Sequence, residues 1–374
     1  MVKTYAIWVI WILLVAVFAP APLPGAEAAK SAALSMVDSA LLNRNQEAAG
    51  SFSSPILGWV PDRQQGGIRP ILGAAGASRL GERVQVPYRD FWPSARWPYG
   101  IAATAGASPA LLLLDYQGKT LEEKILTSGT FRVKQAAFNS LETAVALVLE
   151  ETPEVLLIRG LPADPVTVHL DTRLLPGKLV CLALDEDGST LLAGTLQGDG
   201  GSIYRLTPGG EPQFVLSSRR PAALKFLPRS RNALLLDQES GTLGLIQAAA
   251  TGGGFVLLAD SRQGIVNPSA VEISRDGERA WVLHSGGQAV TAVELNTRKF
   301  ASMNLSRRAE SFASLGGGDG VRISECCGGP VWLLDGSEEM RLVFVPAASR
   351  EFPAERSLAL PRRDAQQPRT NREP

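Results

Sequence analysis

The chain has 374 residues, with 37 basic and 37 acidic side chains, and 45% of its residues are hydrophobic. Zero net charge excludes a long-range field that would draw the protein to nucleic acid or to an anionic membrane, and the apolar fraction excludes a chain that is disordered throughout. Two histidines and three cysteines are too few for a histidine-rich metal centre or a dense disulfide scaffold.

The first residues are typical of an export signal. Lys3 precedes an uncharged apolar run over residues 5–18, which is followed by prolines and by the small-residue sequence Ala26-Glu27-Ala28. This order predicts a cleaved signal peptide over residues 1–28 and an exported protein, periplasmic or extracellular. The alternative is an uncleaved anchor, but the apolar run falls short of the roughly 20 residues that span a bilayer. We therefore expect no stable membrane span after cleavage.

Two low-complexity segments flank the central region. Residues 29–54 are rich in alanine and serine and are expected to form a flexible leader, with a short helix as the alternative. Residues 361–374 place four arginines among Gln, Pro and Asn without apolar periodicity, which predicts a disordered tail. The folded domain is therefore expected over residues 55–360.

The central region contains a repeat of 42 to 50 residues. Five copies share an apolar position at the end of a strand-like run, and these anchors are Phe138, Leu184, Phe226, Ile273 and Ile323. The clearest copy has four such runs, at residues 269–274, 280–284, 289–295 and 300–305. Asp276-Gly277 and Gly286-Gly287 separate them, and Gly tolerates the positive φ angles of tight hairpins. Short strands at a period in the forties are typical of propeller blades.

The number of blades depends on the ends of the repeat region. The scheme accounts for six blades, the last of which takes residues 356–360 as its outer strand. Two further strand-like pieces, at residues 68–72 and 83–86, are either half of a seventh blade or an added strand pair. We therefore predict an all-β propeller of six or seven four-stranded blades.

Two hairpin motifs carry a family resemblance. Ile273-Ser274-Arg275-Asp276-Gly277 precedes Ala280-Trp281-Val282, and Leu184-Asp185-Glu186-Asp187-Gly188 precedes Leu191-Leu192. These segments resemble the S-x-D-G signature of YVTN-type and TolB-like propeller repeats, to which lactonase-like propellers are similar. The resemblance covers roughly residues 90–360 and implies a propeller in a secreted bacterial protein. The motif reports a hairpin geometry, so it transfers no catalytic residue.

One set of equivalent positions could carry chemistry. Eleven residues beyond each anchor, with one insertion in the last copy, the repeat aligns Leu149, Thr195, Asp237, His284 and Asp335. Asp237, His284 and Asp335 are therefore weak candidates for a ring at the propeller mouth that takes a cation or a polar ligand, with His284 as a base. The alternative is that an aspartate at a hairpin start hydrogen-bonds its own turn.

The other polar and aromatic features have mainly structural interpretations. Asp185 and Asp187 could begin a calcium loop, but they align with a hairpin turn. His169 alternates on an outer strand and is expected at the surface. The aromatic group over residues 91–99, interleaved with Arg89 and Arg96, is either a stacking platform or packing between blades, and packing is favoured.

Two of the three cysteines are adjacent. Cys326 and Cys327 lie in the first hairpin of the last copy and form a possible redox pair in an exported protein. Cys181 is expected to be a small buried apolar side chain, although pairing with one of the two is conceivable.

The sequence supports two functional hypotheses. The first is an exported, non-enzymatic binding or interaction scaffold for a protein, a glycan or a cell-envelope component, acting as a monomer without metal or cofactor. The alternative is a lactonase-like hydrolase with a polar or metal site at the propeller mouth. No G-x-S-x-G, H-E-x-x-H or G-x-G-x-x-G motif occurs, which favours the first hypothesis.

Overall fold

The computed structural model describes residues 55–347 apart from 63–65, 89, 106–107, 118–119, 250–252, 317–318, 325–329 and 337–338. The predicted signal peptide, leader and tail lie outside the described residues, as do Arg89, Cys326 and Cys327. The described chain consists of 28 strands and one short 3-10 helix, η1 (Ser261–Gln263). The strands form seven antiparallel sheets of four, so the prediction of a propeller is confirmed and its number of blades is seven.

Each blade is built from four consecutive strands. Blades 1 and 2 comprise β1 (Ile56–Asp62), β2 (Gly67–Ala74), β3 (Ala77–Leu80), β4 (Val84–Gln85), β5 (Asp90–Pro93), β6 (Tyr99–Ala103), β7 (Ala110–Gln117) and β8 (Thr120–Ser128). Blades 3 and 4 comprise β9 (Val133–Phe138), β10 (Ala144–Leu149), β11 (Glu154–Arg159), β12 (Val166–Asp171), β13 (Lys178–Leu184), β14 (Leu191–Gln197), β15 (Gly200–Leu206) and β16 (Gln213–Ser218).

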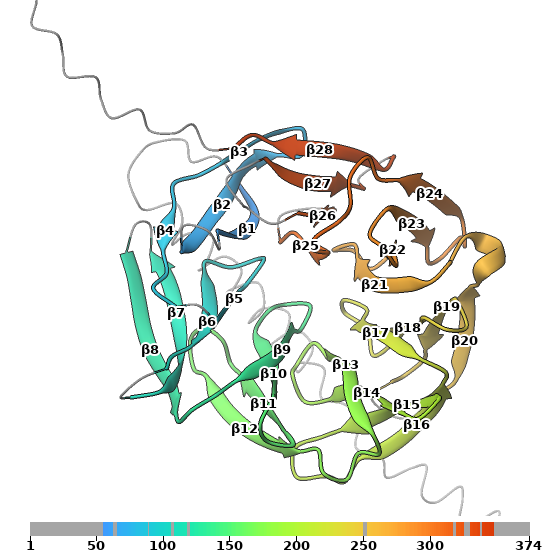
Figure 1. Ribbon diagram of the computed structural model, residues 1–374, viewed down its shortest axis with the longest axis horizontal. Coiled ribbons are helices and arrows are strands. Elements are labelled where there is room, and N and C mark those ends of the chain that lie inside the picture. Colours follow the sequence, from blue (N-terminus) through green and yellow to red (C-terminus); the bar gives the residue numbers. More distant parts are fainter. Residues whose placement is uncertain are drawn as a thin grey trace, which may run out of the picture. The chain divides into compact units, whose positions relative to one another are not determined.

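The remaining three blades follow the same order. Blades 5 and 6 comprise β17 (Pro221–Phe226), β18 (Ala233–Asp237), β19 (Thr242–Ile246), β20 (Phe255–Ala259), β21 (Pro268–Ile273), β22 (Arg279–His284), β23 (Ala289–Glu294) and β24 (Phe300–Asn304). Blade 7 comprises β25 (Ala313–Ser314), β26 (Gly320–Arg322), β27 (Val331–Asp335) and β28 (Arg341–Val345). For blades 2 to 7, Figure 1 shows the first strand near the centre of the ring and the fourth strand at the rim, whereas in blade 1 β3 and β4 both pair with β2.

The core of the propeller is divided into seven clusters, one between each pair of neighbouring blades. Strand β10 shows how the sequence builds them. Ala146 and Val148 face blade 4, whereas Val145 and Leu147 face blade 2. Because both faces of a blade are buried, its second strand is continuously apolar rather than alternating.

Packing between the first and last blades closes the ring. Val60 and Ile71 of blade 1 share a cluster with Leu315, Val331 and Val345 of blade 7. Strands β3 and β28 are in contact there, and Figure 1 shows them side by side.

The two faces of the ring carry different connections. In blades 2 to 7, one face, which we call the crossover face, holds the connections from the fourth strand of one blade to the first strand of the next, together with the hairpins between second and third strands. In these blades the opposite face holds the hairpins between first and second strands and between third and fourth strands. Blade 1 differs, because the end of β4, from which the chain crosses to blade 2, lies beside the β1–β2 hairpin.

Most predicted strands are confirmed, and blade 7 requires a correction. The four runs over residues 269–305 are β21 to β24, and the strand-like pieces within residues 55–89 belong to blade 1, where β3 and β4 both pair with β2. The anchor Ile323, however, follows β26, which is the second strand of blade 7 rather than the first. The first strand, β25, has only two residues and therefore no apolar pattern. Strand β28 ends the described blade, and residues 356–360 lie outside the described residues.

The S-x-D-G motif forms a hairpin turn, as predicted. The Ser274 hydroxyl donates to Asp276 at 2.6 Å, and the carboxylate of Asp276 accepts the backbone N–H of Glu278 at 2.9 Å. Gly277 has a φ of 78°, a left-handed conformation that glycine adopts without strain.

Candidate functional site

Asp237 joins two loops of the crossover face. It lies at the end of β18, and its carboxylate accepts hydrogen bonds from the Ser218 hydroxyl at 2.5 Å and from the backbone N–H of Arg219 at 2.7 Å. It also accepts the backbone N–H of Ser240, in its own hairpin, at 2.9 Å. Burial acts to raise the pKa of Asp237, but the hydrogen bonds outweigh it and hold the pKa below its ordinary value. The bond from Ser240 is of the kind that the alternative interpretation expected, and the bonds from Ser218 and Arg219 add the preceding crossover.

His284, at the end of β22, is held within blade 6. Its Nδ1 lies 2.7 Å from the carbonyl oxygen of Val266, in the preceding crossover. Its Nε2 lies 2.9 Å from the hydroxyl of Thr291, a fully buried residue that also contacts the Ser302 hydroxyl at 2.9 Å. Both ring nitrogens are therefore engaged with groups that fix the crossover against the blade.

Asp335 lies at the other end of its blade, so the prediction that it joins Asp237 and His284 is wrong. It ends β27, the third strand of blade 7, and its carboxylate contacts the Arg341 guanidinium at 2.6 Å. Arg279, at the start of β22, donates to the carbonyl of the adjacent Gly336, which places this end of β27 at the opposite face. The misplacement follows from the anchor Ile323, which belongs to a second strand.

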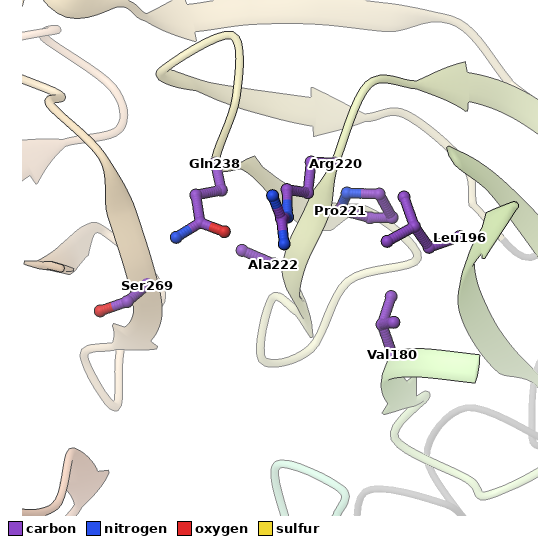
Figure 2. Close-up of a pocket in the computed structure, with 7 residues that line it drawn as sticks. All are labelled: Val180, Leu196, Arg220, Pro221, Ala222, Gln238 and Ser269. Atoms are coloured by element: carbon purple, nitrogen blue, oxygen red, sulfur yellow. The ribbon is translucent and has the colours of Figure 1, made fainter. Parts of the chain in front are cut away.

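A depression on the crossover face lies beside Asp237. Its volume is about 250 Å³, and it is lined by Val180, Leu196, Arg220, Pro221, Ala222, Gln238 and Ser269 (Figure 2). The residues come from blades 4, 5 and 6, mainly from the beginnings of the first strands β13, β17 and β21. The depression therefore combines an apolar lining with three polar side chains.

Arg220 is the charged group of this depression. Its side chain is exposed, and within the described part of the chain it has no hydrogen bond or ion pair through its guanidinium. Its backbone N–H donates to Asp237 at 3.2 Å, and the buried Pro221 follows it. The neighbouring Arg219, in contrast, has a carboxylate partner, Glu239, at 3.9 Å. The crossover thus presents one guanidinium to the depression from a well-anchored backbone.

The other polar groups of the depression have capacity left to accept hydrogen bonds. The side-chain amide nitrogen of Gln238 donates to the Ser285 hydroxyl at 3.1 Å, and this bond links the hairpins of blades 5 and 6. The side-chain carbonyl oxygen of Gln238 can still accept a hydrogen bond from a ligand. The Ser269 hydroxyl donates to the carbonyl of Leu283 at 3.1 Å, and its oxygen can still accept. The sequence analysis did not predict this site, although Arg219-Arg220-Pro221 places two basic side chains at a connection between blades, which could have indicated it.

A second polar group lies at the opposite face, around Glu142. The carboxylate of Glu142 accepts hydrogen bonds from the Ser94 hydroxyl and from the backbone N–H of Arg96, the latter at 2.8 Å. Burial raises the pKa of Glu142, and these hydrogen bonds offset the effect only in part. The carboxylate thus ties the first hairpin of blade 2 to the first hairpin of blade 3.

The aromatic residues near this cluster pack between blades, as favoured from the sequence. The indole N–H of Trp97 donates to the carbonyl of Leu141 at 3.0 Å, and the Arg96 guanidinium lies 4.9 Å from the Trp97 ring centroid. Tyr99 is buried and donates to the Glu142 carbonyl. These rings form no open stacking platform.

The remaining predicted residues have structural surroundings. Cys181 is buried, which raises the pKa of its thiol to about 12, and His169 is exposed beside Glu154 at 3.4 Å. Asp185 accepts the backbone N–H of Thr190 at 2.9 Å, as a turn residue does. Among the described residues, no group of three or more His, Cys, Asp or Glu side chains could hold a metal ion. The described part of the chain also contains no helix with the length and apolar character needed to cross a membrane.

The seven four-stranded sheets make the chain a seven-bladed β-propeller, and several solved structures have the same fold. A functionally unknown protein from Desulfotomaculum acetoxidans has a TM-score of 0.53 at 12% identity, covering 79% of this chain and 100% of that chain. A protein from Lactobacillus plantarum has a TM-score of 0.53 at 15% identity, covering 78% and 96%. A protein from Bacteroides fragilis, provisionally assigned as a 6-phosphogluconolactonase, has a TM-score of 0.51 at 13% identity, covering 80% and 98%.

These structures confirm the resemblance to lactonase-like propellers at the level of the fold. At such identities they show the fold alone. No family model and no curated protein matches the chain.

Proposed function

We propose that the chain is an exported, non-enzymatic β-propeller that binds a partner at its crossover face. The observation that carries the proposal is the contrast between the polar side chains of that face. Asp237 and His284 are engaged in hydrogen bonds that hold loops together, whereas Arg220 projects into an apolar depression. A general base needs a lone pair directed at its substrate, which His284 lacks, and an apolar lining with a few polar groups is the usual composition of a binding site.

Export rests on the order of features in residues 1–28. An exported propeller would meet a protein, a glycan or another cell-envelope component as its partner. The ring closes through its own blades 1 and 7, so the fold is complete without a second copy, and we propose a monomer. Binding through Arg220 and Gln238 would need neither a metal nor a cofactor.

Hydrolysis assays and metal analysis test this proposal against a lactonase-like enzyme. The purified protein would be incubated with a panel of γ- and δ-lactones that includes 6-phosphogluconolactone, and its metal content would be measured. We expect no turnover above the buffer rate. Turnover that is lost in both H284A and D237A, or turnover that depends on a stoichiometric metal, would overturn the proposal in favour of the hydrolase.

A further inference from the structure

The anchoring of Arg220 makes the depression a prepared site rather than a flexible patch. Asp237 receives the backbone N–H groups of both Arg219 and Arg220, at 2.7 and 3.2 Å. Pro221 then fixes the backbone where β17 begins. Because the backbone on both sides of Arg220 is held, less ordering is required when its guanidinium pairs with a ligand.

The polar groups define the charge and the hydrogen bonds of the ligand. A single guanidinium matches a ligand group with one negative charge, and its planar fork matches the two oxygens of a carboxylate. The carbonyl oxygen of Gln238 is available to accept an N–H, because the amide nitrogen already donates to Ser285. Gln238 and Arg220 both line the depression (Figure 2), and the backbone N–H of Gln238 donates to the Arg220 carbonyl at 2.9 Å, so one ligand could meet both side chains. A carboxylate with an N–H donor nearby satisfies this pair.

The apolar lining and the size define the rest of the ligand. Val180, Leu196 and Pro221 present aliphatic surface, and no aromatic ring is among the described residues that line the depression, which argues against a sugar ring that stacks on aromatic side chains. A volume of about 250 Å³ lies below the roughly 300–1,000 Å³ of pockets that enclose whole ligands. The depression therefore fits the end of a longer chain.

We propose that this depression binds the free C-terminus of a protein partner whose last residue is aliphatic. The terminal carboxylate pairs with the Arg220 guanidinium, the terminal N–H donates to the Gln238 carbonyl oxygen, and the last side chain lies against Val180, Leu196 and Pro221. This inference rests on the proposed function, because it names the partner chemistry of the same face.

Peptide binding tests the inference directly. The probe is a fluorescein-labelled peptide of sequence Gly-Ser-Gly-Ser-Ala-Leu, measured by fluorescence anisotropy against the full protein. We expect the free carboxylate to bind at least roughly tenfold more tightly than the C-terminal amide, since a hydrogen bond to a charged group is worth that much. R220Q should weaken binding of the free acid to a similar extent and leave the affinity for the amide unchanged. R219Q is the matched control and should stay within about twofold of the wild type.

The opposite results would overturn it. A C-terminus site would be excluded if the free acid and the amide bound equally, or if R219Q and R220Q lost the same affinity. It would also be excluded if glucuronate or inorganic phosphate displaced the peptide at a lower concentration than the unlabelled peptide does. Absence of peptide binding would exclude it too. Melting temperatures of R220Q and R219Q equal to that of the wild type show that neither variant fails through unfolding. If the peptide does not bind, the proposal of a C-terminus site fails but the proposal of a non-enzymatic binding propeller is unaffected. Lactone turnover, in contrast, would overturn the non-enzymatic proposal.

Discussion

The carboxylate of Glu142 offers a sharp test of how the blades are held together. In E142A, the Ser94 hydroxyl, which is completely buried, loses its acceptor, whereas the backbone N–H of Arg96 loses its shorter bond and keeps the one to the Ser94 oxygen at 3.2 Å. A buried donor without a partner costs about 1–3 kcal/mol. Because the backbone N–H of Arg96 keeps an acceptor, the unpaired Ser94 hydroxyl dominates the total loss of stability. We expect a loss of about 2–3 kcal/mol in the free energy of unfolding.

The assay is thermal unfolding followed by circular dichroism, where such a loss lowers the melting temperature by roughly 5 °C. E239A is the control, because Glu239 is an exposed carboxylate with a distant arginine partner at 3.9 Å. Its removal should change stability by less than about 0.5 kcal/mol. An E142A protein as stable as E239A would refute the reasoning that this carboxylate ties two blades.

The contribution of Glu142 to the stability of the fold depends on pH in a defined direction. Because burial raises the pKa of Glu142 above its ordinary value of 4.5, the folded protein binds this proton more tightly than the unfolded chain does. The resulting stabilisation is complete below the ordinary value and is lost as the pH rises through the raised value. E142Q stays neutral, so the stability of the wild type relative to E142Q should fall as the pH rises above 4.5. A constant difference across that range would contradict the direction of the shift.

Three further predictions concern single side chains. H284A should lose about 0.5–1.5 kcal/mol of stability, measured by urea unfolding, because the buried Thr291 hydroxyl loses one of its hydrogen-bond partners; unchanged stability would show that the imidazole is free. G336A should lose about 1–3 kcal/mol of unfolding free energy, because a Cβ at this position would lie 2.4 Å from the buried Trp281 ring. G200A is the control, because a Cβ there meets open space, and equal stability of the two variants would refute the clash. Cys181 should resist iodoacetamide at pH 8 in the folded protein and react in urea, because burial raises its pKa to about 12; rapid labelling of the folded protein, found by peptide mass mapping, would contradict the burial.

The sequence predicted the blades well because their second strands are buried on both faces. Continuous apolar runs such as residues 144–148 and 233–236 mark those strands, and the turns that carry Gly188 and Gly277 mark the hairpins. Blade 7 was misread because β25 has only two residues, so the repeat was aligned one strand too late. That single offset placed Asp335 at the wrong face.

The candidate site could be predicted only in part. Asp237 and His284 were correctly placed on the crossover face, because their spacing from a first strand is regular. The importance of Arg220 depends on which of two adjacent arginines has a carboxylate partner, and Glu239 determines that through the fold. The burial of Glu142 likewise depends on a hairpin of the neighbouring blade and leaves no local pattern in the sequence.

Site-specific photo-cross-linking in the producing cells tests most directly whether the crossover face binds a partner. A photoreactive phenylalanine would replace Ser269, in the depression, or Arg231, in a hairpin of the opposite face. We predict a discrete cross-linked product from position 269 that R220Q diminishes, and none from position 231. A product from position 231 alone, or from neither position, would contradict the account.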